Sequence, residues 1–238
     1  MKTEHRARLR AAEAFIFDFY GTLAIHDDAP TPMWQVLTEL GYNSAHHLQA
    51  MWDSDAFDGS LTPGAAAGSD YEAWRRGNLK EFVRLSGVPE ELLDETVTQL
   101  LEHAQQATFK PIAGAATLLK LLREHGKKLG VCSNWDYPLQ EELARVKLPP
   151  FDAITISWEA GARKPNAAIF HDICAKLDAR PTAAVYIGDS WSADVVGAIR
   201  AGLMPVWIHR DAQTNPLPHH VAAFETLQAF EAAMKQVL

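Results

Sequence analysis

Four short stretches of the sequence place acids, hydroxyls and a lysine at the ends of apolar segments. They are DFYGTL (18–23), CSNWD (132–136), ARKP (162–165) and GDSWSAD (188–194). A carboxylate such as Asp18 can act as a nucleophile, which divides a difficult displacement into two easier steps. If the group under attack is itself anionic, the reaction needs compensating positive charge from a lysine or a divalent cation. Each stretch alone is common, but the four in this order indicate a catalytic site.

Two acids in these stretches are candidate metal ligands. Asp18 and Asp189 offer hard oxygen ligands, which suit Mg²⁺. Lys164 can neutralise negative charge beside them, and Gly21 allows the backbone to turn tightly near a substrate. Taken one at a time, Lys164 is also compatible with a surface loop and Ser133 with a helix N-cap. Taken together, these residues favour a shared site.

The elements that must position these residues alternate between strands and helices. Apolar runs short enough for buried strands cover residues 14–19, 128–133, 152–157, 183–188 and 204–208. Patterns with helical spacing cover residues 113–126, 166–177 and 192–202. This alternation predicts an α/β fold with a doubly wound parallel sheet. In such sheets, ligands bind at the carboxyl ends of the strands, where the four stretches lie.

The segment that follows the first strand carries helical periodicity only. Apolar side chains three or four residues apart predict helices within 33–41, 46–54, 71–85 and 91–104. We therefore expect an α-helical cap, residues 25–108, inserted into a Rossmann-like core of residues 1–24 and 109–238. Proline and glycine place the hinges near 24–30 and 106–112. The small-residue loop GSLTPGAAAGS (59–69) interrupts the helices and is expected to reach over the sheet.

Charge and composition exclude several classes of partner. The net charge is −8, and no lysine or arginine lies between Ile25 and Trp74, where eight acids occur. Nucleic acid is therefore not an expected partner, since binding phosphate backbones needs a basic surface. No apolar stretch approaches the roughly 20 residues that span a bilayer, and the N-terminus does not resemble a signal peptide. We expect a cytoplasmic protein without a membrane partner; its oligomeric state is not predicted.

The four stretches, in this order at successive strand ends, resemble the motifs of the haloacid dehalogenase superfamily. The resemblance runs across nearly the whole chain, and the helical insertion is similar to a C1-type cap. It implies that Asp18 is the nucleophile and forms a covalent aspartyl intermediate, while Thr22 orients it. It also implies that Ser133 hydrogen-bonds the transferred group and that Lys164 neutralises charge on the nucleophile and the intermediate.

The resemblance further implies a Mg²⁺ site and a surrounding substrate pocket for a small molecule. The implied metal ligands are Asp18, the main-chain carbonyl of Tyr20, and Asp189. The implied substrate-binding residues are Tyr20, Gly21 and Asn134. Asp194 is implied to hold Lys164 or a metal-bound water.

Tyr20 is where the sequence departs from the phosphatases of this superfamily. They carry an aspartate there, which acts as general acid and then as general base. Position 20 is two residues after Asp18, so on a continuing strand both side chains would share one face. The 2-haloacid dehalogenases carry tyrosine at this position, followed by the same Gly-Thr-Leu. Phosphonatases carry a small residue there and use a lysine from the cap.

The rest of the chain argues against both of these alternatives. The dehalogenases need no metal, and they have serine where this chain has Asp189 and asparagine where it has Trp191. They also place an arginine in the early cap, whereas this chain has no arginine or lysine from Ala11 through Trp74. An acidic cap would stabilise a leaving halide poorly. The phosphonatase alternative fails at the same gap, because the predicted cap has one lysine, Lys80.

We therefore expect a Mg²⁺-dependent phosphatase of a small phosphorylated metabolite that works through a phospho-aspartate and has Tyr20 in place of the general acid. Loss of that acid costs roughly 10²–10⁴ in rate, and aryl or acyl phosphates, which depart without protonation, would suffer least. The alternatives are a hydrolytic 2-haloacid dehalogenase and a non-catalytic ligand-binding relative. A non-catalytic relative is disfavoured because the chain retains Asp18, Lys164, Asp189 and Asp194.

Overall fold

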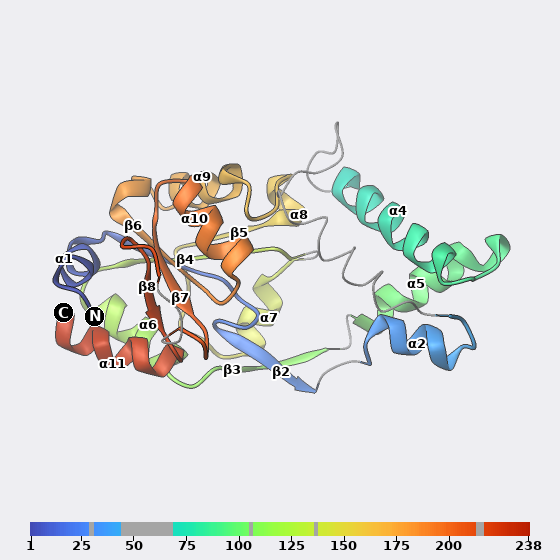
Figure 1. The fold of residues 1–238 in the computed structure, drawn as a ribbon, viewed down its shortest axis with the longest axis horizontal. Coiled ribbons are helices and arrows are strands. Elements are labelled where there is room, and N and C mark those ends of the chain that lie inside the picture. Colours follow the sequence, from blue (N-terminus) through green and yellow to red (C-terminus); the bar gives the residue numbers. More distant parts are fainter. Residues whose placement is uncertain (29–30, 44–68, 105–106, 136–137, 213–216) are drawn as a thin grey trace.

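The five predicted strands occur in the computed structural model and pair in parallel with a sixth strand in one sheet (Figure 1). The structure describes residues 1–28, 31–43, 69–104, 107–135, 138–212 and 217–238. The strands are β1 (Ala14–Phe17), β4 (Lys128–Ser133), β5 (Ala153–Ile156), β6 (Ala184–Gly188), β7 (Met204–Ile208) and β8 (Ala222–Phe224). The first strand ends at Phe17 rather than at the predicted residue 19, so Asp18 lies just beyond it.

The strand order explains where the site forms. The order is β5-β4-β1-β6-β7-β8, so the chain builds outward from β1 on both sides. The order reverses at β1, which makes the carboxyl ends of β1 and its neighbours the switch point where α/β sheets bind ligands. Asp18 follows β1, Ser133 ends β4 and Asp189 follows β6. Three of the four predicted stretches therefore meet at one edge of the sheet.

Helices cover both faces of the sheet (Figure 1). One face packs against α1 (Thr3–Ala11), α6 (Ala115–Glu124), α7 (Gln140–Arg145) and α11 (Leu227–Val237). The other packs against α9 (Ala167–Lys176) and α10 (Val196–Arg200). Alternation along β1 places Phe15 and Phe17 in the first layer and Ala14 and Ile16 in the second. Full burial of each phenylalanine contributes about 1.5–3 kcal/mol, which fixes β1 between the layers.

Several short elements extend the predicted pattern. The elements α1, α7, α11 and β8 are additional to those predicted from the sequence. The predicted helix over 192–202 is instead a π-helical turn, η3 (Trp191–Val195), followed by α10. Two further short elements, α8 (Ser157–Ala160) and the 3₁₀ turn η2 (Pro181–Ala183), precede α9 and β6 respectively. The π-helical turn matters most, because it carries Asp194 and such turns are frequent at functional sites.

A separate group of helices follows β1 in the sequence, and we call it the helical group. It consists of α2 (Met33–Glu39), α4 (Ser69–Leu85), the 3₁₀ turn η1 (Glu90–Leu92) and α5 (Leu93–Ala104). Its own apolar cluster includes Leu37, Leu79, Val83 and Leu100, and it stands beside the sheet core in Figure 1. The predicted helix over 46–54 and the loop over 59–68 lie outside the described residues. No described helix combines the length and apolar character needed to cross a bilayer.

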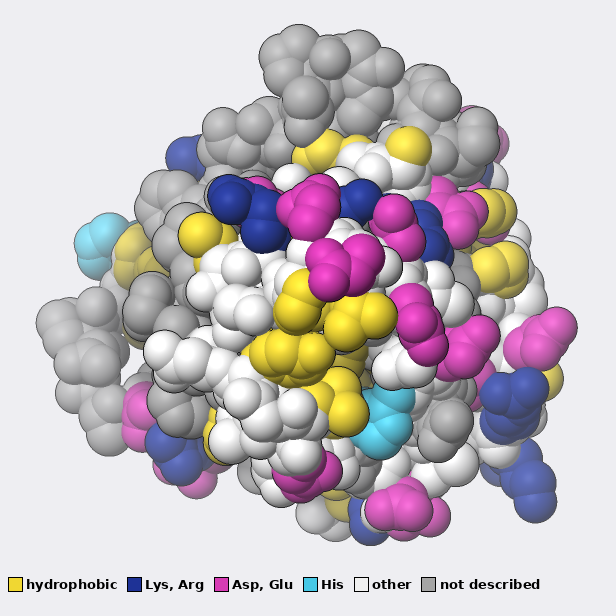
Figure 2. Space-filling view, turned by 90° about the vertical axis from the view of Figure 1, so that its right-hand side faces the viewer, with side chains coloured by type: hydrophobic (Ala, Val, Ile, Leu, Met, Phe, Trp, Pro, Cys, Tyr) yellow, Lys and Arg dark blue, Asp and Glu magenta, His cyan; other side chains and the backbone are white. Residues whose placement is uncertain are grey.

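The two segments predicted as hinges, 24–30 and 106–112, contain two strands that pair into a ribbon. Strand β2 (Ala24–Asp28) pairs antiparallel with β3 (Thr108–Pro111), and His26 lies opposite Phe109. The ribbon joins the helical group to the core (Figure 1). Seen from the helical side, acidic side chains spread over much of the surface around a small group of hydrophobic ones (Figure 2).

Candidate active site

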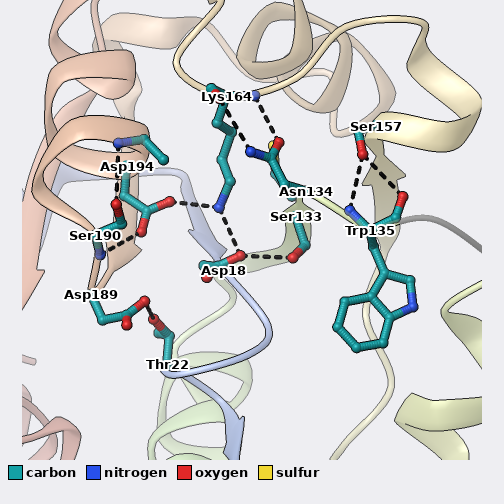
Figure 3. Close-up of polar contacts among 12 residues, drawn as sticks. Asp18, Thr22, Ser133, Asn134, Trp135, Ser157, Lys164, Asp189, Ser190 and Asp194 are labelled. Carbon is teal, nitrogen blue, oxygen red and sulfur yellow. Dashed lines mark hydrogen bonds and ion pairs between the residues drawn. The ribbon is translucent and has the colours of Figure 1, made fainter. Parts of the chain in front are cut away.

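Asp18 lies at the centre of the predicted residues, directly after β1 (Figure 3). Its side chain is buried, and its Oδ1 accepts hydrogen bonds from Ser133 Oγ at 2.8 Å and Lys164 Nζ at 2.7 Å. Among the described residues, these are the hydrogen bonds to its carboxylate. Oδ2 therefore remains available to attack a substrate or to bind a cation.

The Lys164 ammonium is held by three partners. Besides Asp18, its Nζ donates to Asp194 Oδ1 at 2.6 Å and to Tyr186 Oη at 3.0 Å. An ammonium has three hydrogens, so all of its donors are used. Burial lowers the pKa of Lys164, but the charges of Asp18 and Asp194 outweigh that effect and raise the pKa overall. Lys164 is therefore a fixed positive charge next to Asp18.

Asn134 contacts the main chain of Lys164. Its Nδ2 donates to Lys164 O at 3.1 Å, and its Oδ1 accepts from Lys164 N at 2.8 Å (Figure 3). The Asn134 amide thus bonds to both main-chain groups of Lys164, as a residue on a neighbouring strand would. The contact joins the end of β4 to the loop that carries the lysine. The amide expected to line the substrate pocket is thus placed to position Lys164.

Asp194 is buried, and both of its oxygens are engaged. Its Oδ1 accepts from Lys164 and lies 3.1 Å from Tyr186 Oη, whose one hydrogen is donated to Cys132 O. Its Oδ2 accepts from Ser190 N at 2.9 Å. Burial raises the pKa of Asp194, and the neighbouring lysine charge opposes that rise. Gly188 makes room for this carboxylate, since a Cβ there would lie 2.3 Å from it.

Asp189 faces the turn after Asp18. Gly21 has a φ of +89°, and a Cβ on it would lie 2.4 Å from Asp189 Oδ2, so both conformation and space require glycine. Thr22 Oγ1 donates to Asp189 Oδ1 at 3.4 Å, so the hydrogen bond of this threonine goes to Asp189. Burial raises the pKa of Asp189, and the charge of Asp18 raises it further. The two carboxylates therefore repel each other.

This group of acids can hold a metal. Candidate ligand oxygens of Asp18, Asp189 and Asp194 lie within 4.8 Å of one another. The oxygens of Asp194 are already bonded to Lys164 and to the main chain, which leaves the other two carboxylates best placed for a cation. A hard divalent ion fits these oxygen donors and would relieve the repulsion that raises the pKa of Asp189.

Tyr20 lies in the turn beyond β1. The expectation that it shares a strand face with Asp18 is wrong, because the strand ends at Phe17. Its ring is 45% exposed and packs on His26, with ring centroids 4.7 Å apart. Burial raises the pKa of Tyr20, and the charge of Asp189 adds to this effect.

Two residues that position the site were not predicted from the sequence. Tyr186, on β6, has its hydroxyl within 3.0 Å of Lys164 Nζ, and it donates to Cys132 O at 2.7 Å. Trp207, on β7, donates from Nε1 to Asp189 O at 2.8 Å. A hydroxyl inside the otherwise apolar strand AVYIG was the available signal for Tyr186. Trp207 gave no such signal, because tryptophan suits a buried strand.

A parallel sheet whose strand ends gather Asp18, Ser133, Lys164 and two further acids is typical of an α/β enzyme of the hydrolase class. A family profile described as haloacid dehalogenase-like hydrolase matches residues 12–202. The chain therefore belongs to the haloacid dehalogenase-like hydrolases, as the four motifs predict.

Individual relatives include phosphatases. The chain is 36% identical to a glyceraldehyde 3-phosphate phosphatase of Methanopyrus kandleri over 139 residues, which cover 58% of this chain and 60% of that one. It is 28% identical to pyrimidine 5′-nucleotidase YjjG of Escherichia coli over 166 residues, 68% of either chain. The matched stretch thus spans about three-fifths to two-thirds of these relatives.

A dehalogenase shares the fold. The crystal structure of a 2-haloacid dehalogenase from Pseudomonas syringae aligns with a TM-score of 0.64. The alignment covers 95% of this chain and all of that one at 19% identity, which is a likeness of fold alone.

Proposed function

We propose that the protein is a Mg²⁺-dependent phosphatase of a small phosphorylated molecule and that it acts through a phospho-aspartate on Asp18. The observation that carries this proposal is the pair of carboxylates Asp18 and Asp189. With the buried Asp194 they form a group of three neighbouring carboxyl groups, of which Asp18 and Asp194 pair with the Lys164 ammonium. This excess of negative charge calls for a cation before an anionic phosphate can approach.

Each residue has a role in the proposed chemistry. Asp18 Oδ2 attacks phosphorus while Oδ1 stays bonded to Ser133 and Lys164. These two donors hold the carboxylate in one orientation, which lowers the entropic cost of reaching the geometry for attack. Asp18, the main-chain carbonyl of Tyr20, and Asp189 would hold Mg²⁺. When bound, Mg²⁺ supplies charge stabilisation for the phosphoryl oxygens.

Residues 25–108, which include the helical group, are proposed to form the cap that covers the substrate. Support comes from its separate apolar cluster and from the paired ribbon β2–β3 that connects it to the core. The contact between Arg163 and Trp74 joins it to the loop of Lys164, with the guanidinium carbon 5.5 Å from the ring centroid.

A hydrolytic 2-haloacid dehalogenase is the second candidate, and Tyr20 is the residue that favours it. The fold likeness to the Pseudomonas structure does not discriminate, because both activities use this fold. Asp189 argues against it, since a carboxylate beside the nucleophile would hinder a reaction that proceeds without a metal. The phosphatase names of the sequence relatives add support for phosphate esters.

A substrate panel tests the proposal. Purified protein is incubated with phosphorylated metabolites, with Mg²⁺ or with EDTA, and inorganic phosphate is measured. We expect Mg²⁺-dependent release that is lost in Asp18→Asn. A parallel incubation with L-2-chloropropionate measures chloride. Enzyme-dependent chloride release, or phosphate release that is indifferent to EDTA, would reverse the ranking of the two candidates.

A further inference from the structure

Two partly exposed aromatic residues lie in the segments next to Asp189, Tyr20 in the turn after β1 and Trp191 at the start of η3. Tyr20 is 45% exposed and Trp191 is 37% exposed, whereas most large apolar side chains of the core are buried. Tyr20 precedes Gly21, the residue that lies against the Asp189 carboxylate. Trp191 follows Asp189 by two residues and begins the turn η3. Both residues therefore belong to segments that flank the proposed reaction centre.

The Tyr20 ring rests on the ribbon. It packs on His26 at a centroid distance of 4.7 Å and meets Phe109 edge-on at 6.2 Å. His26 and Phe109, which are opposite each other in the β2–β3 pair, stack at 4.9 Å with an interplanar angle of 27°. This backing holds the ring in place, so binding a flat group against it costs little side-chain entropy.

The Trp191 ring is backed in the same way from the sheet. It meets Trp207 edge-on at 5.1 Å, and Trp207 stacks on His209 at 4.8 Å with an angle of 3°. Trp207 also donates to the carbonyl of Asp189. The aromatic support of Trp191 is thus bonded directly to a residue of the reaction centre.

The absence of a general acid at position 20 favours substrates with an aromatic leaving group. Tyr20 provides no carboxyl proton for a departing oxygen, so a leaving group that is stable as an anion is required. Phenolate anions meet this condition, and their flat rings can stack on aromatic side chains. Relative to the phosphatases with aspartate at this position, Tyr20 therefore lacks the acid and provides an aromatic surface.

We propose that Tyr20 and Trp191 bind the leaving group of an aryl phosphate, a phosphate monoester of a phenol. This inference rests on the proposed phosphatase activity. Asp18 forms a bond to phosphorus, and the bond from phosphorus to the phenolic oxygen breaks. The phenolate leaves with the electron pair and takes a proton from solvent. Water then attacks phosphorus, which releases inorganic phosphate and regenerates the Asp18 carboxylate.

The test compares 4-nitrophenyl phosphate with acetyl phosphate, which also departs without protonation but has no ring. In Trp191→Leu and in Tyr20→Leu, kcat/KM for the aryl substrate should fall roughly 5- to 100-fold, mainly through KM, because a stacked ring is lost. Acetyl phosphate should change less than about threefold in the same proteins, because it makes no stacking contact. Trp191→Phe and Tyr20→Phe keep a ring and should restore most of the aryl activity. Leu85→Ala, an exposed position in α4, is the control and should leave both substrates unchanged.

The outcomes separate this inference from the proposed function. If acetyl phosphate is hydrolysed but the leucine variants leave the aryl KM unchanged, the aromatic site is wrong and the phosphatase proposal stands. An equal loss for both substrates would show a structural effect and would also overturn the inference. If wild-type protein with Mg²⁺ hydrolyses neither phosphate but releases phosphate from another member of the metabolite panel, the inference fails and the phosphatase proposal stands.

Discussion

Two adjacent residues, Arg163 and Lys164, belong to regions that are held together by different interactions. Lys164 is 3% exposed and lies in a network of charged hydrogen bonds to Asp18 and Asp194. Arg163 reaches the other way, over the ring of Trp74 in the helical group. The first region holds the Lys164 and Asp18 side chains in place, because removing one partner from a buried charge network costs several kcal/mol of stability. The second is a cation–π contact of about 0.5–2 kcal/mol, weak enough to be broken and remade.

The difference predicts a graded response to mutation. Changes in the buried network should act mainly on kcat, and changes at the contact with the helical group should act mainly on KM. The same loop carries both residues, so it can couple the position of the helical group to the position of the lysine.

The largest effect is expected at the nucleophile. Asp18→Asn keeps the shape of the side chain and removes the attacking charge, so kcat should fall by at least about 10⁴-fold. Circular dichroism should show an unchanged fold. A variant that retains activity within about tenfold of wild type would remove Asp18 from this role.

Metal removal comes next. EDTA should lower activity by roughly 10³-fold, since the cation supplies several kcal/mol of charge stabilisation, and added Mg²⁺ should restore it. Mg²⁺ should also raise the Tm of the wild type, because a ligand that binds the folded state stabilises it. Asp189→Asn is the matched variant and should lose most of this Tm shift. An equal shift in both proteins would place the ion elsewhere.

Tyr20→Asp probes the missing acid. An acid at position 20 should raise the rate for alkyl phosphates relative to aryl phosphates, by up to about 10²-fold, because alkoxide departure needs a proton. The half-exposed ring leaves little void when it is removed. Tyr20→Asn, which cannot donate a carboxyl proton, is the control. A ratio of alkyl to aryl rates that is the same in the two variants would show that proton donation is not limiting.

Tyr186→Phe tests the support behind the lysine. It removes the hydroxyl that accepts from Lys164 and donates to Cys132 O, so unfolding free energy should fall by about 1–3 kcal/mol. We expect kcat to drop about tenfold with little change in KM, as measured by steady-state kinetics and urea denaturation. Tyr42→Phe, in the helical group, is the control for loss of a tyrosine hydroxyl. A kcat equal to that of wild type would limit Tyr186 to a structural role.

The smallest effect is expected at the contact with the helical group. Arg163→Gln removes the cation that lies over Trp74 and should raise KM by about twofold to fivefold with kcat unchanged. Arg210→Gln, whose parent side chain is 89% exposed, is the surface control. A loss that falls on kcat would mean that Arg163 belongs with the buried network.

The sequence predicts the strands because continuous apolar runs such as 128–133 and 204–208 can only be buried on both faces of a sheet. It misses β8, which has only three residues. The prediction also omits α11, although Leu227, Phe230 and Met234 have helical spacing. The motifs mark the ends of β4 and β6, whereas β1 ends two residues before its predicted limit.

The partners within the site are harder to predict. Asn134 bonds to the main chain of Lys164, which is 30 residues away in sequence. Thr22 bonds to Asp189 through the geometry of the turn at Gly21. Tyr20 lies outside β1, because the strand ends at Phe17. Each of these depends on where loops converge, and sequence spacing does not specify that.

The central claim is a phosphoryl group carried on Asp18, and a rapid acid quench tests it directly. Protein is mixed with Mg²⁺ and an aryl phosphate that it turns over, quenched within one turnover, and mapped by mass spectrometry. The account predicts one phosphate on the peptide that contains Asp18 and none in Asp18→Asn. A phosphate on another residue, or an ester of Asp18 formed from L-2-chloropropionate, would contradict it.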